Sequence, residues 1–553
     1  MKKILLTLCL LALAATACND FLDMTPRDSI SDKVMWSTTE TAEYAVNSIY
    51  SYAYDIFAYW PSAVGMTEAF TDEFKYGSYV NFAYCLIPSQ VAYGGTNLTN
   101  SFVDVYLGCW GTLYDAIRRT NEAISNLRSI GAVLPEADRT RLEAELRVMR
   151  GWLYFELVKR YKDVIIYDED LTQIAVDKAL STEEQGWDFI QADLDFAAVN
   201  LPEKAAAGGR LDRGVALALT TRAMLYAGRW SKVIEAADAL ELLGYSLEPS
   251  YADAFVKTVQ AGNKETILQY SFSYSDGLTH EFDYYYAPGG DYKLVGQQGG
   301  GYGTPTQEMV ESYELATGGF PDWSPWHSST TVDPPYDKLE PRFQATVLYN
   351  KAVWKERRIE PWVGGTDGWC QWNKEPQPQG RTTTGYYLRK FVDESHDLAV
   401  RSQSTQHFVI LRYGEVLLNK AEACYNNGDP DGANAAVKAI RARAGLPYGN
   451  KSGDDLWQAI RQERRIELAY EGCWYWDLRR WGDAVKDWPE GLNNYQVHGL
   501  RIEPTAVDGQ YLYTYVSVDD RDRNFPQKML SRFPIPDSEL NSNSLVNQYP
   551  EWN

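Results

Sequence analysis

The pattern of apolar and polar positions predicts a mainly helical chain. A period of three to four residues begins near Glu40 and is clearest over 136–161, and this is the spacing of one face of an α-helix. The apolar positions that carry the period in this segment are Leu142, Leu146, Met149, Leu153 and Leu157. Trp152 and Phe155 lie on a second face of the same predicted helix. Because both faces are apolar, we expect this helix to lie between two neighbours.

An internal repeat, offset by about 200 residues, predicts paired helices. The copies cover 216–240 and 415–440, and each consists of a predicted helix, a turn at Gly228 or Gly428, and a second helix. The pattern resembles tetratricopeptide-type hairpins, which must stack on neighbours to bury their apolar faces. Further members of the stack are predicted over 103–130, 136–161 and 183–200.

The two copies are separated by a segment of different composition. Residues 272–405 contain 15 Gly and 10 Pro and no sustained helical period, which predicts loops and short strands. We therefore predict a mainly α fold, in which a tetratricopeptide-like scaffold of helical hairpins (an α-α superhelix) carries an irregular, loop-rich capping insertion. The scaffold would have an N-terminal part over 40–271 and a C-terminal part over 406–553.

The first residues have the pattern of a bacterial secretion signal. Two lysines precede an apolar stretch over 4–13, and small residues follow. That stretch is too short to cross a bilayer as a helix. Cys18 stands directly after the small residues, so we expect 1–17 to be removed, Cys18 to be acylated and 18–39 to form a leader. Two or more acyl chains hold a protein stably on a membrane. The alternative is an ordinary signal peptide with a chance cysteine.

The composition of the chain limits the classes of partner that it can bind. The chain has 553 residues and a formal charge of −22, from 53 basic and 75 acidic side chains. Such a surface repels phosphate groups, so we expect no nucleic-acid partner, and membrane contact through the lipid anchor only. The cysteines and the five histidines show neither a metal-ligand spacing nor a disulfide framework. We therefore expect no Cys/His metal site and no cofactor, and leave open a structural Ca²⁺ ion in a loop.

Aromatic residues are unusually frequent, with 18 Trp and 39 Tyr. Six tryptophans fall in the insertion, where we expect some indoles at a surface or cleft, although burial in a core is the alternative for any single ring. An exposed indole can stack on the apolar face of a sugar ring. Our candidate ligand-binding residues are Trp323, Trp326, Trp362, Trp369 and Trp372, together with Asp72, Tyr76 and Tyr79 from an earlier loop.

The sequence carries no familiar catalytic motif. No G-x-S-x-G, H-E-x-x-H or P-loop pattern occurs. A glycosidase needs two carboxylates about 5–10 Å apart, and 75 acidic residues leave that alternative open. Arg464, Glu467 and Glu471 are one turn apart on a helix predicted over 455–471. We interpret them as a structural ion-pair network rather than as catalytic groups.

Four ordered stretches carry a resemblance to a known family. They are 18–23 with Trp36 downstream, 412–423 (RYGEVLLNKAEA) with 441–446 (RARAGL), 464–481 (with RRIELAYEG and WDLRRW), and 534–552, which begins PIPDSEL. Together they resemble the SusD/RagB-like outer-membrane lipoproteins of Bacteroidetes. Residues 473–475 depart from the basic and aromatic pair more usual in the family, and this bears on local packing only.

The resemblance implies a cell-surface protein that captures oligosaccharides and passes them to a SusC-like, TonB-dependent barrel in the outer membrane, and that is not an enzyme. It also implies a tetratricopeptide-like scaffold, whose hairpins would face the barrel. The ligand face would be formed by 272–405 with loops near 60–110. The alternatives are a peptide-binding member of the same family, a glycoside hydrolase, or a helical-repeat scaffold with no small ligand.

Overall fold

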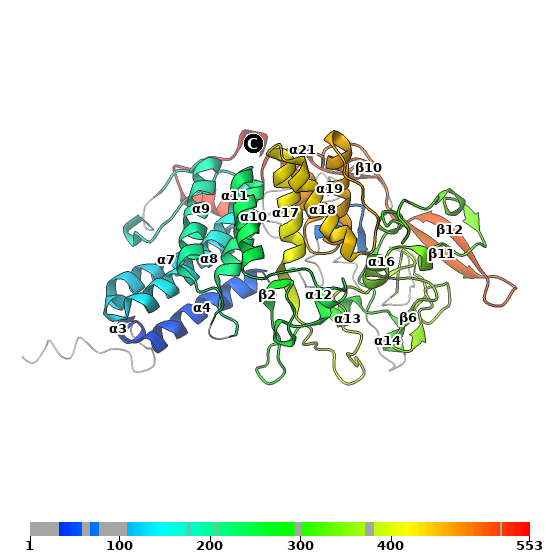
Figure 1. Cartoon of the computed structure of the whole chain (residues 1–553), viewed down its shortest axis with the longest axis horizontal. Coiled ribbons are helices and arrows are strands. Elements are labelled where there is room, and N and C mark those ends of the chain that lie inside the picture. The colour runs from blue at the N-terminus through cyan, green and yellow to red at the C-terminus, as the bar shows by residue number, and fades with distance from the viewer. Residues whose placement is uncertain are drawn as a thin grey trace, which may run out of the picture.

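One half of the molecule is helical, and the other is built from short strands, short helices and loops (Figure 1). The computed structural model describes residues 32–57, 67–76, 108–173, 177–205, 208–293, 300–370, 381–519 and 522–552. The scaffold helices are α3 (Asp32–Met35), α4 (Thr39–Phe57), α7 (Trp110–Ser129), α8 (Glu136–Tyr161), α9 (Glu183–Asn200), α10 (Arg213–Tyr226), α11 (Trp230–Leu242), α17 (Tyr413–Asn426), α18 (Pro430–Arg443), α19 (Gly453–Glu467) and α20 (Trp474–Arg480). The predicted mainly α fold is confirmed.

Helix α8 is the centre of the N-terminal scaffold. It has the predicted bounds and packs between α7 and α9, with α4 and α10 also in contact. Side chains on both of its apolar faces are buried, among them Leu146, Leu153 and Phe155. The next helix, α9, begins with a capping box, in which Thr182 and Gln185 satisfy each other's backbone N–H groups. The predicted position of α8 between neighbours is thus confirmed.

The two repeat copies form the two predicted hairpins. Helices α10 and α11 turn at Gly228 (φ 68°), and α17 and α18 turn at Gly428 (φ 77°). Glycine is favoured at both turns because it adopts positive φ without a Cβ clash. Helix α17 packs against both α10 and α11, and the side-by-side arrangement is visible in Figure 1. The stack of hairpins therefore continues in space although the insertion interrupts it in sequence.

The insertion leaves and rejoins the scaffold at a single two-stranded sheet, which we call the neck. Strand β2 (Thr266–Tyr270) runs antiparallel to β9 (Phe408–Arg412), with Tyr270 opposite Phe408 and Thr266 opposite Arg412. Strand β9 leads directly into α17. The neck therefore fixes the position of the insertion on the scaffold. The strand before the insertion pairs with the strand after it, so both ends of the insertion are held at the same place.

The cap is a set of short elements around an aromatic core. Its members are α12 (Asp253–Val256), α13 (Phe282–Tyr286), α14 (Gly290–Lys293), β3 (Gly303–Pro305), α15 (Gln307–Glu311), β4 (Ser329–Thr330), α16 (Pro341–Thr346), β5 (Val347–Leu348), β6 (Val353–Trp354), β7 (Arg357–Arg358) and β8 (Tyr387–Leu388). Its core includes Tyr286, Tyr313, Phe343 and Trp354, each with no exposed surface. The predicted loops and short strands of 272–405 are thus found.

Segments outside the insertion complete the cap. Strands β11 (His498–Pro504) and β12 (Tyr511–Ser517) form a hairpin that pairs with β4 and projects at one end of the molecule (Figure 1). Strand β1 (Phe74–Tyr76) pairs with β3. The expected C-terminal scaffold part, 406–553, therefore also contributes to the cap, because the hairpin buries Leu500, Ile502 and Tyr513 in the cap core. The remaining C-terminal elements are β10 (Asn493–Tyr495), β13 (Arg523–Asn524), α21 (Gln527–Ser531) and α22 (Asp537–Ser542).

A buried carboxylate joins scaffold, neck and cap. Glu467, at the end of α19, pairs with Arg412 of the neck at 2.7 Å, with Arg342 of the cap at 3.1 Å, and with Arg443 of α18. Glu471 pairs with Arg412 at 2.7 Å. Burial alone would raise the pKa of Glu467, but the charges of Arg443, Arg412 and Arg342 outweigh it and hold that pKa well below its ordinary value.

The predicted structural role of Arg464, Glu467 and Glu471 agrees with these contacts, but the predicted pairing along one helix is wrong. Helix α19 ends at Glu467 and Tyr470 has a positive φ of 61°, so Glu471 does not lie on the same helix. Arg464 pairs instead with Asp477 of α20 at 3.0 Å. The charges therefore join separate elements rather than neighbouring turns.

We expect Glu467→Gln to lower the free energy of unfolding by about 3–5 kcal/mol, because it leaves buried arginines with less compensating charge. The measurement is urea unfolding followed by tryptophan fluorescence. Glu503→Gln is the matched control, since Glu503 pairs with Arg501 on a partly exposed surface, where such pairs contribute about 0–1 kcal/mol. Equal, small losses in the two variants would contradict the structural role of the network.

Candidate functional site

One predicted candidate, Trp362, forms a partly exposed aromatic pair on the cap. Its ring lies 4.8 Å from that of Tyr511, the first residue of β12, with the ring planes at 35°. Both side chains are half-buried. Tyr511 was missed in the sequence, although tyrosines at 511, 513 and 515 have the alternating pattern of a strand. We call Trp362 and Tyr511 the cap platform.

The loop that carries Trp362 is held by a buried aspartate. The carboxylate of Asp367 accepts hydrogen bonds from the backbone N–H groups of Glu360 (2.9 Å) and Gly290 (2.8 Å) and from Arg357 (2.7 Å). The loop also reaches the projecting hairpin, because the N–H of the residue after Trp362 donates to the Ile502 carbonyl at 2.8 Å. The indole is therefore positioned by a rigid turn rather than by a free loop.

Glycines in this turn allow the indole to fold back over the backbone. A Cβ at Gly365 would stand 2.9 Å from Nε1 of Trp362, and a Cβ at Gly368 would stand 1.6 Å from the Trp362 carbonyl oxygen. Any larger residue at Gly368 would clash with backbone that cannot yield. The glycines at 365 and 368 therefore have a local steric cause, and Gly364 adopts a positive φ of 85°.

Charged side chains surround the cap platform. The Nζ atom of Lys351 lies 5.1 Å from the centre of the Tyr511 ring and pairs with Asp333 at 2.8 Å. Burial, followed by the nearby charges of Glu360, Asp508 and Asp333, raises the pKa of Tyr511. Flat apolar rings bordered by carboxylates and an ammonium group offer both stacking and hydrogen bonding to a ligand.

Two other candidates, Trp323 and Trp326, are part of the cap core. Their side chains are only 6% and 8% exposed, and their rings meet at 5.6 Å. The indole N–H of Trp326 donates to the Val332 carbonyl at 2.9 Å. Because these rings are almost entirely buried, they are not available for stacking on a ligand, and the expectation of an exposed platform there is corrected.

Asp72 and Tyr76 are also buried. The carboxylate of Asp72 pairs with Arg465 at 2.5 Å, and the Tyr76 hydroxyl shares a hydrogen bond of 2.8 Å with Tyr286. Both side chains therefore act in packing. Trp369 is half-buried against the scaffold core. The remaining candidates, Tyr79, Trp372 and the lipidation residue Cys18, lie outside the described residues, as do most of the loops near 60–110.

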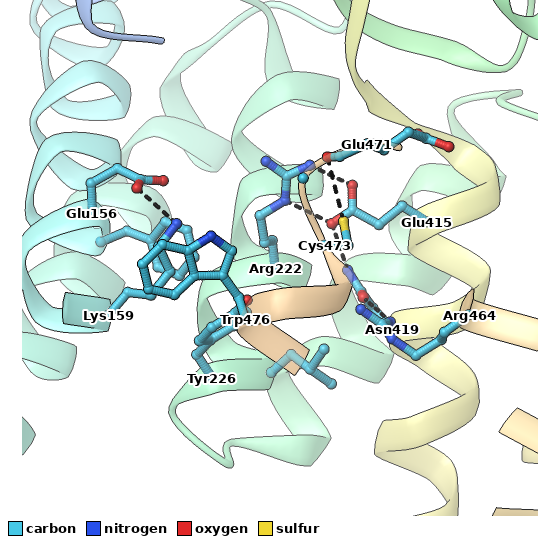
Figure 2. Close-up of a pocket in the computed structure, with 13 residues that line it drawn as sticks. Glu156, Lys159, Arg222, Tyr226, Glu415, Asn419, Arg464, Glu471, Cys473 and Trp476 are labelled. Carbon is cyan, nitrogen blue, oxygen red and sulfur yellow. Dashed lines mark hydrogen bonds and ion pairs between the residues drawn. The ribbon is translucent and has the colours of Figure 1, made fainter. Parts of the chain in front are cut away.

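A small polar cavity lies inside the scaffold (Figure 2). Its volume is about 50 Å³, which is enough for water but far below the roughly 300–1,000 Å³ of ligand sites. Lys159 pairs with Glu156 at 2.7 Å, and Arg222 pairs with Glu415 at 2.5 Å. The cavity is therefore a compensated polar core, not a sugar site.

Burial shifts the pKa values of ionisable groups in this cavity. Burial lowers the pKa of Lys159 to about 8. Burial, followed by the charges of Glu415 and Asp477, raises the pKa of the Cys473 thiol far above its ordinary value, so this thiol stays protonated and is a poor nucleophile. Among the described residues, no cluster of His, Cys, Asp and Glu could hold a metal ion, and none of the helices is long and apolar enough to cross a membrane.

Comparisons with known proteins identify the class. The model of the SusD family (SusD_RagB) matches residues 264–552, so the chain belongs to the SusD family. A SusD-like protein of Bacteroides ovatus is 24% identical over all of this chain and 98% of its own length. A crystal structure of a SusD-like protein from Bacteroides fragilis has a TM-score of 0.76 and 26% identity, covering 95% of this chain and all of that one.

A second solved structure from Bacteroides fragilis, described as a SusD-like carbohydrate binding protein, has a TM-score of 0.74 and 22% identity, covering 93% of this chain and all of that one. The predicted tetratricopeptide-like fold and the SusD/RagB resemblance are thus confirmed.

Glu68, in the segment before β1, makes the stability of the fold depend on pH. Glu68 is buried, and one of its oxygens accepts the Gly472 N–H at 2.6 Å. Burial raises the pKa of Glu68 from 4.5 to about 7. A carboxyl group with a raised folded-state pKa contributes stability below the unfolded pKa, and that contribution is lost as the pH rises through about 7. We therefore expect Glu68→Gln to have a free energy of unfolding about 3 kcal/mol larger than that of the parent at pH 8. The variant should accordingly unfold at a higher temperature.

The measurement is thermal unfolding at pH 5 and at pH 8. Glu490→Gln, at a side chain that is 70% exposed, is the matched control and should follow the parent at both pH values. If Glu68→Gln also followed the parent at both pH values, the assigned raised pKa of Glu68 would be wrong.

Proposed function

We propose that this protein is a cell-surface binding protein that captures oligosaccharides and passes them to a SusC-like, TonB-dependent transporter in the outer membrane. The observation that carries the proposal is the cap platform, in which Trp362 and Tyr511 present half-buried rings 4.8 Å apart inside a charged border. Membership of the SusD family, and the description of a structural neighbour as carbohydrate binding, support the same ligand class.

The physical basis is the two-sided nature of a sugar ring. Its apolar C–H face stacks on an indole or phenol ring and releases water, at roughly 25 cal/mol per Å² of apolar surface removed. Its hydroxyl groups need partners, since a desolvated and unpaired polar group costs about 1–3 kcal/mol. Lys351, Asp333 and Glu360 stand beside the platform and supply both donors and acceptors. A platform of two rings gives modest affinity and fast release, which suits transfer to a transporter.

The proposal includes a lipid anchor and no catalytic step. Cys18 is acylated after removal of 1–17, and the acyl chains hold the folded body at the outer membrane. Part of the scaffold surface faces the barrel, and the cap faces the ligand. Binding alone is the proposed activity, in line with the description of a structural neighbour as carbohydrate binding.

We expect Trp362→Ala to weaken oligosaccharide binding by about tenfold, or about 1.4 kcal/mol, because the stacking face is lost. The measurement is isothermal titration calorimetry of the soluble chain over 19–553 with neutral gluco-, manno- and xylo-oligosaccharides. Trp488→Ala is the matched control, because Trp488 is 38% exposed and stacks on Tyr495 rather than on the cap platform. Unchanged affinity for every sugar that binds would reject the platform as the site.

We expect Cys18→Ala to abolish incorporation of labelled palmitate and to release the protein from the outer-membrane fraction, because the thiol at the acylation site is lost. Cys109→Ala is the control, since that cysteine lies just before α7 within the scaffold, and it should leave labelling and fractionation unchanged. Full palmitate labelling of the Cys18→Ala variant would contradict the anchor.

A further inference from the structure

A groove of about 600 Å³ lies on the scaffold. Its walls come from the turn between α10 and α11, the end of α17, the first turns of α19, and the residues around the end of α20. Its volume is in the range of small-ligand sites, about 300–1,000 Å³. Because these elements come from four separate parts of the chain, only the stacking of the hairpins brings the groove together.

Half-buried aromatic rings line this groove. Trp457 of α19 is stacked on Tyr425, with ring centres 5.3 Å apart and planes at 21°, and meets Trp481 edge to face at 5.4 Å. Trp230 at the start of α11 adds a third indole to the lining. All three indoles are partly exposed. The guanidinium groups of Arg461 and Arg480 each lie 4.9 Å from the centre of the Trp481 ring. Aromatic rings are usually covered where a core is available, so the two remaining partly exposed indoles, Trp230 and Trp457, point to a ligand.

Each basic side chain that lines the groove has a carboxylate partner, and two of them share Asp483. Arg480 pairs with Glu422 at 2.6 Å. Asp483 pairs with Arg461 at 2.6 Å and with Lys486 at 2.7 Å. No cation in this set is left to attract a phosphate or a carboxylate, and the three pairs hold the groove walls in place. The balance of charge therefore favours a neutral ligand.

We propose that this groove is a second carbohydrate-binding site, which takes a short, neutral oligosaccharide. The faces of Trp230 and Trp457 stack on sugar rings, and the exposed side chains of Asp454, Asn426 and Gln458 bond the hydroxyl groups. The ligand class rests on the function proposed above, whereas the site itself lies on the scaffold and shares no residue with the cap platform.

Other ligand classes fit this groove less well. An extended peptide is recognised by a free strand edge or by apolar pockets for alternate side chains, and helices and turns supply the described walls of the groove. An anionic ligand needs uncompensated cations, which the paired charges do not offer. A neutral oligosaccharide needs flat apolar faces and polar partners at the rim, and the groove provides both.

The two sites together would act on one glycan. A glycan long enough to reach both sites is held by the first site at a high effective concentration near the second. Its overall affinity therefore exceeds that of either site alone. Oligosaccharides shorter than the separation of the two sites report each site separately. The number of short oligosaccharides bound per chain therefore tests the inference directly.

The experiment is isothermal titration calorimetry of the 19–553 chain with neutral gluco-, manno- and xylo-hexasaccharides. We expect two bound molecules per chain for a sugar that binds. Trp457→Ala and Trp230→Ala, which change different elements lining the groove, should each weaken one of the two sites by about tenfold or more and leave the site that Trp362→Ala removes unchanged. Circular dichroism checks that each variant is folded, and Trp488→Ala is the matched control.

The outcomes separate the two proposals. One bound molecule that only Trp362→Ala removes would overturn the groove site and leave the proposed function standing. Loss of binding in both groove variants but not in Trp362→Ala would support the groove and reject the cap platform. A second molecule that binds unchanged in both groove variants would place it elsewhere and overturn the inference, and no binding of any sugar would overturn both proposals.

Discussion

The carboxylate of Glu467 is the point at which the three parts of this molecule meet. It is fully buried and receives an arginine from the cap (Arg342), one from the neck (Arg412) and one from the scaffold (Arg443). A buried charge is tolerated only when its partners are close and well oriented. The cap therefore has a defined orientation on the scaffold, since a tilt at the neck would separate at least one of these pairs.

The aromatic core of the cap follows from the shortness of its helices and strands. Short strands and loops provide little regular backbone to build around, so large aromatic side chains fill the interior, as Trp354, Tyr313 and Phe343 do with no exposed surface. Such packing takes up many of the aromatic rings in this part of the chain. Those that remain partly exposed, above all Trp362 and Tyr511, stand on a rigid turn and on the projecting hairpin.

Rigidity and modest contact area fit the proposed role. A preorganised platform loses little entropy on binding, and two rings bury too little surface to hold a ligand for long. The scaffold groove, with its three indoles and internally paired charges, extends the same chemistry to a second face. A protein that binds without chemistry and must then release its ligand is well served by several weak sites rather than one deep pocket.

The sequence alone determined the regular part of the molecule. The period over 136–161, the glycine turns at 228 and 428, and the glycine- and proline-rich insertion predicted the helices, the two hairpins and the cap, because periodicity and turn chemistry are local. Only the tertiary structure decided which aromatic rings are exposed. Trp326 and Trp362 come from the same kind of local sequence, yet one is enclosed by the cap core while the other meets Tyr511 at the surface. Burial depends on what distant segments place over a ring, and no local pattern records that.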